Sequence, residues 1–146
     1  MLSEFSVVSD IRRRGGIHFK DWQVDGVSLR TWIDNRTGRT NVWDIVGLPD
    51  YEPLAQRMVE VLRRRSSAEL PSGRAVLYRC PECLDIGCGA FAVRVTRRGD
   101  EIVWSDFTWE TDCEPVPPGG GGEFALLPEI HFTAAQYDAE LRKSAH

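Results

Sequence analysis

Residues 91–109 read FAVRVTRRGDEIVWSDFTW, and this stretch decides the fold. Apolar and polar side chains alternate over residues 91–96, as they do in a strand with one buried face. The Arg-Gly-Asp at 98–100 is typical of a turn, and residues 101–109 return rich in Ile, Val, Trp and Phe. The alternation breaks at Asp106-Phe107, which indicates a β-bulge. The stretch therefore predicts an antiparallel hairpin whose second strand is bulged.

A second hairpin is predicted nearer the N-terminus. Two β-rich runs, Ile17–Val24 and Val27–Ile33, flank the dipeptide Asp25-Gly26, which is a strong hairpin signal. The turn-forming residues Asp34–Gly38 follow, and Asn41–Val46 can then add a third antiparallel strand. We expect a three-stranded meander.

Two helices are predicted to complete the fold. Residues 51–65 carry apolar side chains at helical spacing, with Asp50 as the expected cap and Pro53 tolerated in the first turn. A C-terminal helix should begin at Thr133, which has capping-box spacing with Gln136. Short strands are expected at 75–79 and 129–132. The predicted fold class is α+β, with an antiparallel sheet of about six or seven strands, one main amphipathic helix and a C-terminal helix.

Length and composition limit the possible architectures. The 146 residues suit a single domain, 1–146, able to bury a sizeable core. Residues 1–16 are polar and end in three arginines and two glycines, which predicts an irregular N-terminal arm. Residues 115–122 hold three prolines and four glycines, which predicts a mobile loop.

The charge balance restricts the classes of partner. A net charge of -4 and a pI near 5.4 argue against a general affinity for nucleic acid or an anionic membrane. No apolar run approaches the roughly 18 residues of a membrane span, and the first residues lack the order of a signal peptide. We therefore expect a cytoplasmic protein.

The four cysteines raise the possibility of a metal site. Cys80 and Cys83 form a Cys-x2-Cys turn, Cys88 follows across a glycine-flanked bend, and Cys113 lies at the far end of the returning strand. Antiparallel pairing would bring Cys113 back beside the other three, so one structural zinc ion is a candidate cofactor. The second pair is more widely spaced than in most zinc motifs. Buried or free thiols, thiol-redox chemistry and no cofactor at all stay open.

The distribution of acidic residues predicts a docking surface. From Gly99 to Glu140 the chain has no Lys or Arg but ten Asp and Glu residues. An acidic face that carries aromatic side chains would steer toward, and anchor, a basic protein partner. The alternative is that the aromatic side chains fill the core and the acids keep the hairpin edge soluble. The candidate partner-binding residues are Trp104, Asp106, Trp109, Glu110, Asp112 and Glu114.

The cysteine segment also carries a resemblance. Residues 77–90, LYRCPECLDIGCGA, together with Trp104-Ser-Asp-Phe107 and Phe132–Tyr137, resemble a family of small actinobacterial-type proteins. That family shares a Cys-Pro-Glu-Cys-Gly-Asp-x-Gly-Cys-Gly-Ala segment, from which this chain departs at Leu84. Some such proteins are similar to immunity proteins of bacterial toxin systems. Cys113 lies outside the shared pattern, which weakens a four-cysteine zinc site.

These observations favour a non-enzymatic, immunity or antitoxin-like protein that occludes a basic surface of a toxin. The sequence has no nucleophile elbow, P-loop or His-Glu-x-x-His helix, so catalysis is the minority hypothesis. The alternative is a zinc-binding or thiol-redox protein centred on the cysteines.

Overall fold

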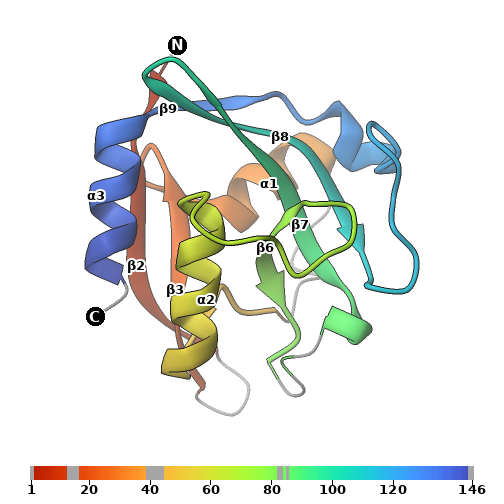
Figure 1. Ribbon diagram of the computed structural model, residues 1–146, viewed down its shortest axis with the longest axis horizontal. Helices are drawn as coiled ribbons and strands as arrows, with labels where there is room; N and C mark the ends of the chain where they lie inside the picture. Colours follow the sequence, from red (N-terminus) through yellow and green to blue (C-terminus); the bar gives the residue numbers. More distant parts are fainter. Residues whose placement is uncertain (1, 13–16, 39–44, 82–83, 85, 145–146) are drawn as a thin grey trace.

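The computed structural model describes residues 2–12, 17–38, 45–81, 84 and 86–144, and their fold is α+β, as the sequence predicts (Figure 1). The elements in chain order are β1 (Leu2–Ser3), β2 (Phe5–Arg12), β3 (Ile17–Val24), β4 (Val27–Ser28), α1 (Leu29–Thr37), β5 (Leu48–Pro49), α2 (Glu52–Leu62), β6 (Ala75–Arg79), the 3-10 turn η1 (Ile86–Cys88), β7 (Ala90–Arg98), β8 (Glu101–Glu110), the 3-10 turn η2 (Gly122–Leu126), β9 (Ile130–Thr133) and α3 (Ala134–Ser144). None of the helices in these residues is long and apolar enough to cross a membrane.

The first sheet has the strand order β1-β9-β8-β7-β6 and contains the predicted hairpin. β7 and β8 pair antiparallel from Arg98↔Glu101 at the turn to Ala90↔Glu110 at the open end. The register shifts by one residue between Ala92↔Thr108 and Arg94↔Ser105, so the predicted bulge at Asp106-Phe107 is confirmed. The added parallel pair, β1 with β9, was not predicted.

The second sheet is built on β3, which pairs with β2, β4 and β5. The turn at Asp25-Gly26 is confirmed, since both residues have positive φ as a two-residue hairpin turn requires. The strand predicted over Val27–Ile33 is wrong beyond Ser28, because helix α1 begins at Leu29. Leu29 and Ile33 lie one helical turn apart and are both buried, so packing on the core selects the helix.

The irregular N-terminal arm is also a wrong prediction. Residues 5–12 form β2 and pair along their whole length with β3. Phe5 is fully buried and lies within about 6 Å of four aromatic rings, which come from both sheets and from α3: Trp22, Trp104, Phe132 and Tyr137. This aromatic cluster joins the two sheets. Residues 13–16 lie outside the described part of the chain.

Two of the linking segments differ from the expected turns. The cluster Asp34–Gly38 closes α1 rather than a hairpin, with Gly38 in the left-handed conformation and its N–H donated to Asp34 O. Most of the strand expected over Asn41–Val46 lies outside the described residues. Within them, Val46 forms an isolated antiparallel bridge with Arg79.

The main amphipathic helix is confirmed as α2, and it buries Met58, Val59, Val61 and Leu62. Pro53 lies in the first turn, where its missing N–H has no helical partner. The expected cap at Asp50 is wrong, because the N-cap is Tyr51 and makes no side-chain hydrogen bond to the helix.

The C-terminal helix is confirmed as α3, but Gln136 has a different role from the one predicted. Its Oε1 accepts a hydrogen bond from the Phe5 N–H at 3.0 Å, and its Nε2 donates to the Phe5 carbonyl. These two bonds occupy the outward backbone groups of an edge strand, which would otherwise be open to pairing. Gln136 therefore fixes α3 to β2.

Candidate functional site

A buried arginine, Arg74, organises the open end of the β7–β8 hairpin. Its side chain is 0 % exposed and lies among carboxylates and carbonyls of β8 and of the segment after it. All five of its N–H donors are used: Nε donates to Asp106 O at 3.0 Å, Nη1 to Glu110 Oε2 at 3.2 Å and Val116 O at 2.7 Å, and Nη2 to Asp106 Oδ2 at 2.7 Å and Pro117 O at 3.2 Å. We call Ser72, Arg74, Arg94, Asp106 and Glu110 the Arg74 cluster.

Asp106 enters the cluster because of the bulge. Its φ of 56° is left-handed, a conformation that Asp tolerates better than most residues, and the bulge directs its carboxylate toward Arg74. Burial acts to raise the pKa of Asp106, but the Gly119 N–H, Arg74 and Arg94 outweigh it and hold the pKa below its ordinary value. Asp106 is therefore a carboxylate at neutral pH.

Glu110 supplies the second negative charge, with a side chain that is 0 % exposed. Its Oε1 accepts a hydrogen bond from the Ser72 hydroxyl, and its Oε2 accepts from both Arg74 and the Val116 N–H. A buried carboxylate with this many donors is compensated for its loss of water. Arg74 and Glu110 thus form a fully buried ion pair.

The cluster holds the segment that we call the acidic loop, residues 111–121. Four hydrogen bonds join its backbone to side chains of the cluster: Arg74 to Val116 O, Arg74 to Pro117 O, the Val116 N–H to Glu110 and the Gly119 N–H to Asp106. Gly121 packs so closely that a β-carbon there would lie 2.5 Å from Phe107 O. The structure therefore gives the backbone of this segment, which overlaps the mobile loop predicted over residues 115–122, defined hydrogen-bond partners.

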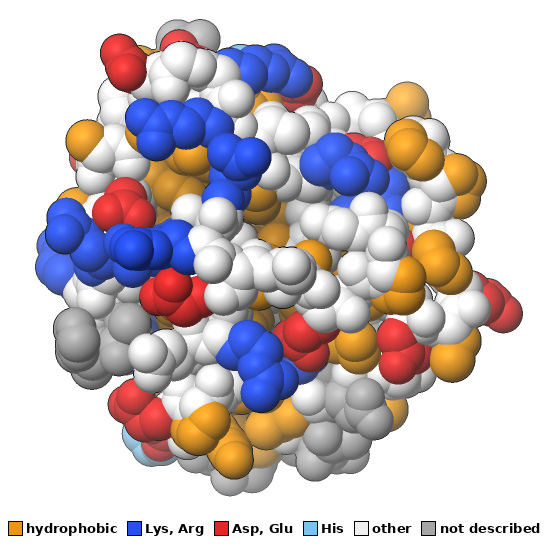
Figure 2. Space-filling model, viewed as in Figure 1, with side chains coloured by type: hydrophobic (Ala, Val, Ile, Leu, Met, Phe, Trp, Pro, Cys, Tyr) orange, Lys and Arg blue, Asp and Glu red, His pale blue; other side chains and the backbone are white. Residues whose placement is uncertain are grey.

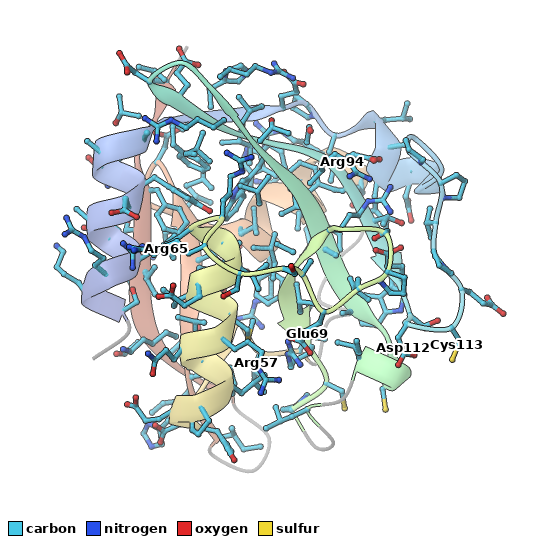
Figure 3. All side chains as sticks on the ribbon, viewed as in Figure 1. Arg57, Arg65, Glu69, Arg94, Asp112 and Cys113 are labelled. Atoms are coloured by element: carbon cyan, nitrogen blue, oxygen red, sulfur yellow. The ribbon has the colours of Figure 1, made fainter. Side chains whose placement is uncertain are left out.

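The acidic loop turns its remaining side chains to solvent. Asp112, Glu114 and the prolines at 115, 117 and 118 are exposed, and Leu126 on the adjoining η2 is 85 % exposed. Figure 2 shows apolar and acidic side chains along the right-hand rim of the molecule, whereas Lys and Arg side chains lie over the rest of this face, mixed with acidic ones. Asp112 and Cys113 project from the same edge in Figure 3.

The structure separates the six predicted partner-binding residues. Trp104 is fully buried and donates its indole N–H to Tyr137 at 3.2 Å, and Glu110 and Asp106 are held by Arg74. Trp109 is half-buried and packs over Gly89, where a β-carbon would overlap its indole. Asp112 and Glu114 alone among the six are exposed. The other four predicted residues are buried or partly buried, so they position the site but do not face a partner.

The predicted one-sided acidic face is largely neutralised by the protein's own basic side chains. Along the hairpin and α3, further carboxylates of the 99–140 stretch pair with Lys or Arg: Glu129 with Arg98, Asp138 with Arg63 and Arg142, and Glu140 with Lys143. The prediction failed because it counted only the 99–140 stretch, whereas Arg63, Arg74 and Arg98 before it and Arg142 and Lys143 after it pair with its carboxylates. Among the described residues, Asp112 and Glu114 of the acidic loop form no ion pair.

The cysteines do not form a metal centre in the described part of the chain. Cys88 and Cys113 are exposed and Cys80 is half-buried, and no group of three His, Cys, Asp or Glu side chains there is placed to hold an ion. Cys83 lies outside the described residues. A hydrogen bond from Cys113 to Asp112, with the charge of that carboxylate, raises the pKa of the thiol and makes it a poor nucleophile.

The residue that sequence reasoning missed is Arg74. It lies in an otherwise polar loop before β6, 32 residues from Asp106 and 36 from Glu110, and no local pattern marks it as buried. The break in the alternation of apolar and polar residues at Asp106 was the one available signal, since a charged side chain placed at a bulge needs a partner of opposite charge. In comparisons with known proteins, no family model, curated protein or solved structure matches this chain, so the resemblance given by its cysteine segment stays a prediction.

Proposed function

We propose that the chain is a non-enzymatic binding protein that acts in the cytoplasm and docks on a basic surface of a partner protein through the acidic loop. The observation that carries the proposal is the buried Arg74 cluster, which fixes the backbone of a loop whose own side chains are exposed. An immunity or antitoxin-like role, in which the loop occludes a toxin, fits this arrangement.

Rigidity supports the proposal. Ordering a flexible loop on binding costs free energy, and a loop already held in place avoids that cost. The acidic loop is held by backbone hydrogen bonds to Arg74, Asp106 and Glu110, which leaves its side chains outside the cluster. Building the core does not require this anchoring, because the loop has few apolar side chains to bury. Apart from its prolines and Cys113, Val116 is its one apolar residue.

The chemistry of the exposed side chains supports a basic protein partner. Asp112 and Glu114 would steer a positively charged surface and set its orientation. Leu126 and the three prolines supply apolar area beside these charges, as the centre of a protein interface requires. These exposed residues therefore combine negative charge with apolar area, which are the two features of a docking surface.

The test uses the protein encoded by the gene adjacent to the one that encodes this chain. We expect the chain to bind that protein and to protect cells that express it. Reversal of two charges, Asp112→Lys with Glu114→Lys, should weaken binding by on the order of tenfold at low salt, mainly through a slower association rate. Binding is measured by surface plasmon resonance at two salt concentrations.

The matched control is Glu4→Lys with Asp100→Lys. It changes the net charge equally, and both residues are exposed at the opposite end of the β7–β8 hairpin. This variant should bind like the unaltered chain. Equal binding by the loop variant would show that the surface is misplaced, and failure to bind or protect would contradict the immunity-like role.

A further inference from the structure

Residues 115–118 of the acidic loop read Pro-Val-Pro-Pro, which is a PxxP sequence. A proline ring fixes its own φ at about −65° and directs the residue before it to extended backbone. Glu114, Val116 and Pro117 each precede a proline, and no residue of the loop lies in a helix or a strand. These restrictions together favour a short polyproline II helix over residues 114–118.

A type II turn ends this polyproline segment after Pro118. Gly120 donates its N–H to Pro117 O at 2.9 Å, and Gly119 has a φ of 75°, the positive value that the third residue of such a turn requires. Pro118 is the second residue of the turn, a position that favours proline. The restricted segment therefore contains a single PxxP unit.

The polyproline II geometry separates the exposed prolines from the anchored residue. Because this helix has three residues per turn, Pro115 and Pro118 lie on the same face. Val116 is half-buried, its N–H donates to Glu110 Oε2 at 2.9 Å, and its carbonyl accepts a hydrogen bond from Arg74 at 2.7 Å. Pro115 and Pro118 are both exposed. The structure therefore holds the backbone between the two proline rings and leaves the rings accessible to a partner.

Negative charge lies next to the exposed prolines. Asp112 and Glu114 are exposed and precede Pro115 in the loop, which follows β8 along the right-hand edge of the molecule in Figure 1. A surface that receives the prolines also meets these two carboxylates. Electrostatic complementarity therefore favours Lys or Arg at the rim of that surface.

We propose that the partner's docking surface is a groove lined by aromatic side chains, with Pro115 and Pro118 as the two anchors, a proposal that rests on the proposed function. Segments with PxxP spacing dock in aromatic-lined grooves because the preformed helix loses little conformational entropy on binding. Basic side chains at the rim of the groove pair with Asp112 and Glu114. The acidic loop is thus read by shape as well as by charge.

The test measures the binding of three single variants to the protein encoded by the adjacent gene, by surface plasmon resonance. Pro115→Ala and Pro118→Ala should each weaken binding by on the order of tenfold, as the loss of an interface anchor does. Pro117→Ala is the matched control, since it removes an exposed proline ring from the same loop but from a different face of the helix. This control should bind within about twofold of the unaltered chain. Effects of similar size in all three variants would overturn the pair of anchors.

An NMR spectrum of the chain, isotopically labelled at proline, tests the aromatic chemistry of the groove. Protons above the face of an aromatic ring are shifted upfield by its ring current. The ring protons of Pro115 and Pro118 should therefore move upfield when the partner binds, while those of Pro53, exposed in the first turn of α2, stay in place. Weaker binding by the two anchor variants without these upfield shifts would contradict an aromatic groove.

The outcomes distinguish this proposal from the proposed function. If the charge reversal at Asp112 and Glu114 weakens binding but no proline variant does, docking on a basic surface is supported and the aromatic groove is wrong. If Pro115→Ala and Pro118→Ala weaken binding and the charge reversal does not, the groove is supported and its basic rim is wrong. No binding by the unaltered chain contradicts both proposals.

Discussion

Replacing Arg74 with alanine is expected to lower the free energy of unfolding by about 3–5 kcal/mol, as found when one partner of a buried ion pair is removed. The substitution leaves Glu110 buried with a negative charge and breaks both hydrogen bonds to the carbonyls of the acidic loop. Urea unfolding followed by tryptophan fluorescence measures the change.

Arg97→Ala is the matched control, because Arg97 is exposed on β7 and the chemical change is the same. It should shift stability by about 0.5 kcal/mol or less. Arg74→Lys should recover only part of the loss, since an ammonium has three donors where the guanidinium uses five. Equal unfolding midpoints for Arg74→Ala and Arg97→Ala would contradict the buried cluster.

Acid sensitivity should follow from the same cluster. The pKa of Asp106 is lowered in the folded protein, so the stability it contributes is present above its unfolded pKa. That contribution is lost as the pH falls through the folded pKa. Arg74→Ala removes a main cause of the lowered pKa and should make the acid decline in stability shallower.

Replacing Phe5 with alanine should cost about 3–5 kcal/mol, the range for large-to-small changes of buried phenylalanine. The ring is 0 % exposed and lies between aromatic side chains of both sheets and α3. The cavity would therefore open at the junction of the sheets. Thermal unfolding by circular dichroism gives the melting temperature, and urea titration gives the free energy.

Ile11→Ala tests whether the effect belongs to β2 in general or to the buried ring. Ile11 lies on the same strand but is 52 % exposed, so its truncation should cost under about 1 kcal/mol. A Phe5→Ala variant as stable as Ile11→Ala would contradict the burial of Phe5 at the junction of the two sheets.

Sequence patterns predicted correctly those elements that a single continuous stretch of sequence determines. The β7–β8 hairpin, its bulge and α2 follow from alternation, turn residues and helical spacing within one stretch each. The strand expected over Val27–Ile33 failed because Leu29 and Ile33, four residues apart, share a face in a strand as well as in a helix. Only packing on the core distinguishes the two.

The candidate site was less accessible to sequence because burial of charge depends on distant partners. Asp106, Glu110, Asp112 and Glu114 look alike in the sequence, yet Glu110 is buried, Asp106 is partly buried and the other two are exposed. Which of these carboxylates lie inside the site depends on Arg74, and only the tertiary structure brings Arg74 next to them. Acidic residues therefore mark the neighbourhood of the site, and the arginine decides which of them can face a partner.

Hydrogen exchange of two amides, Val116 and Gly119, tests the central claim most directly. Each N–H donates to a carboxylate of the Arg74 cluster, at 2.9 Å in both cases. We predict that both amides in the free protein exchange on the order of a hundredfold more slowly than in an unstructured chain, and that Arg74→Ala removes this protection in molecules that are still folded. Exchange at unstructured rates in the intact protein, with β8 protected, would contradict a loop fixed in advance for its partner.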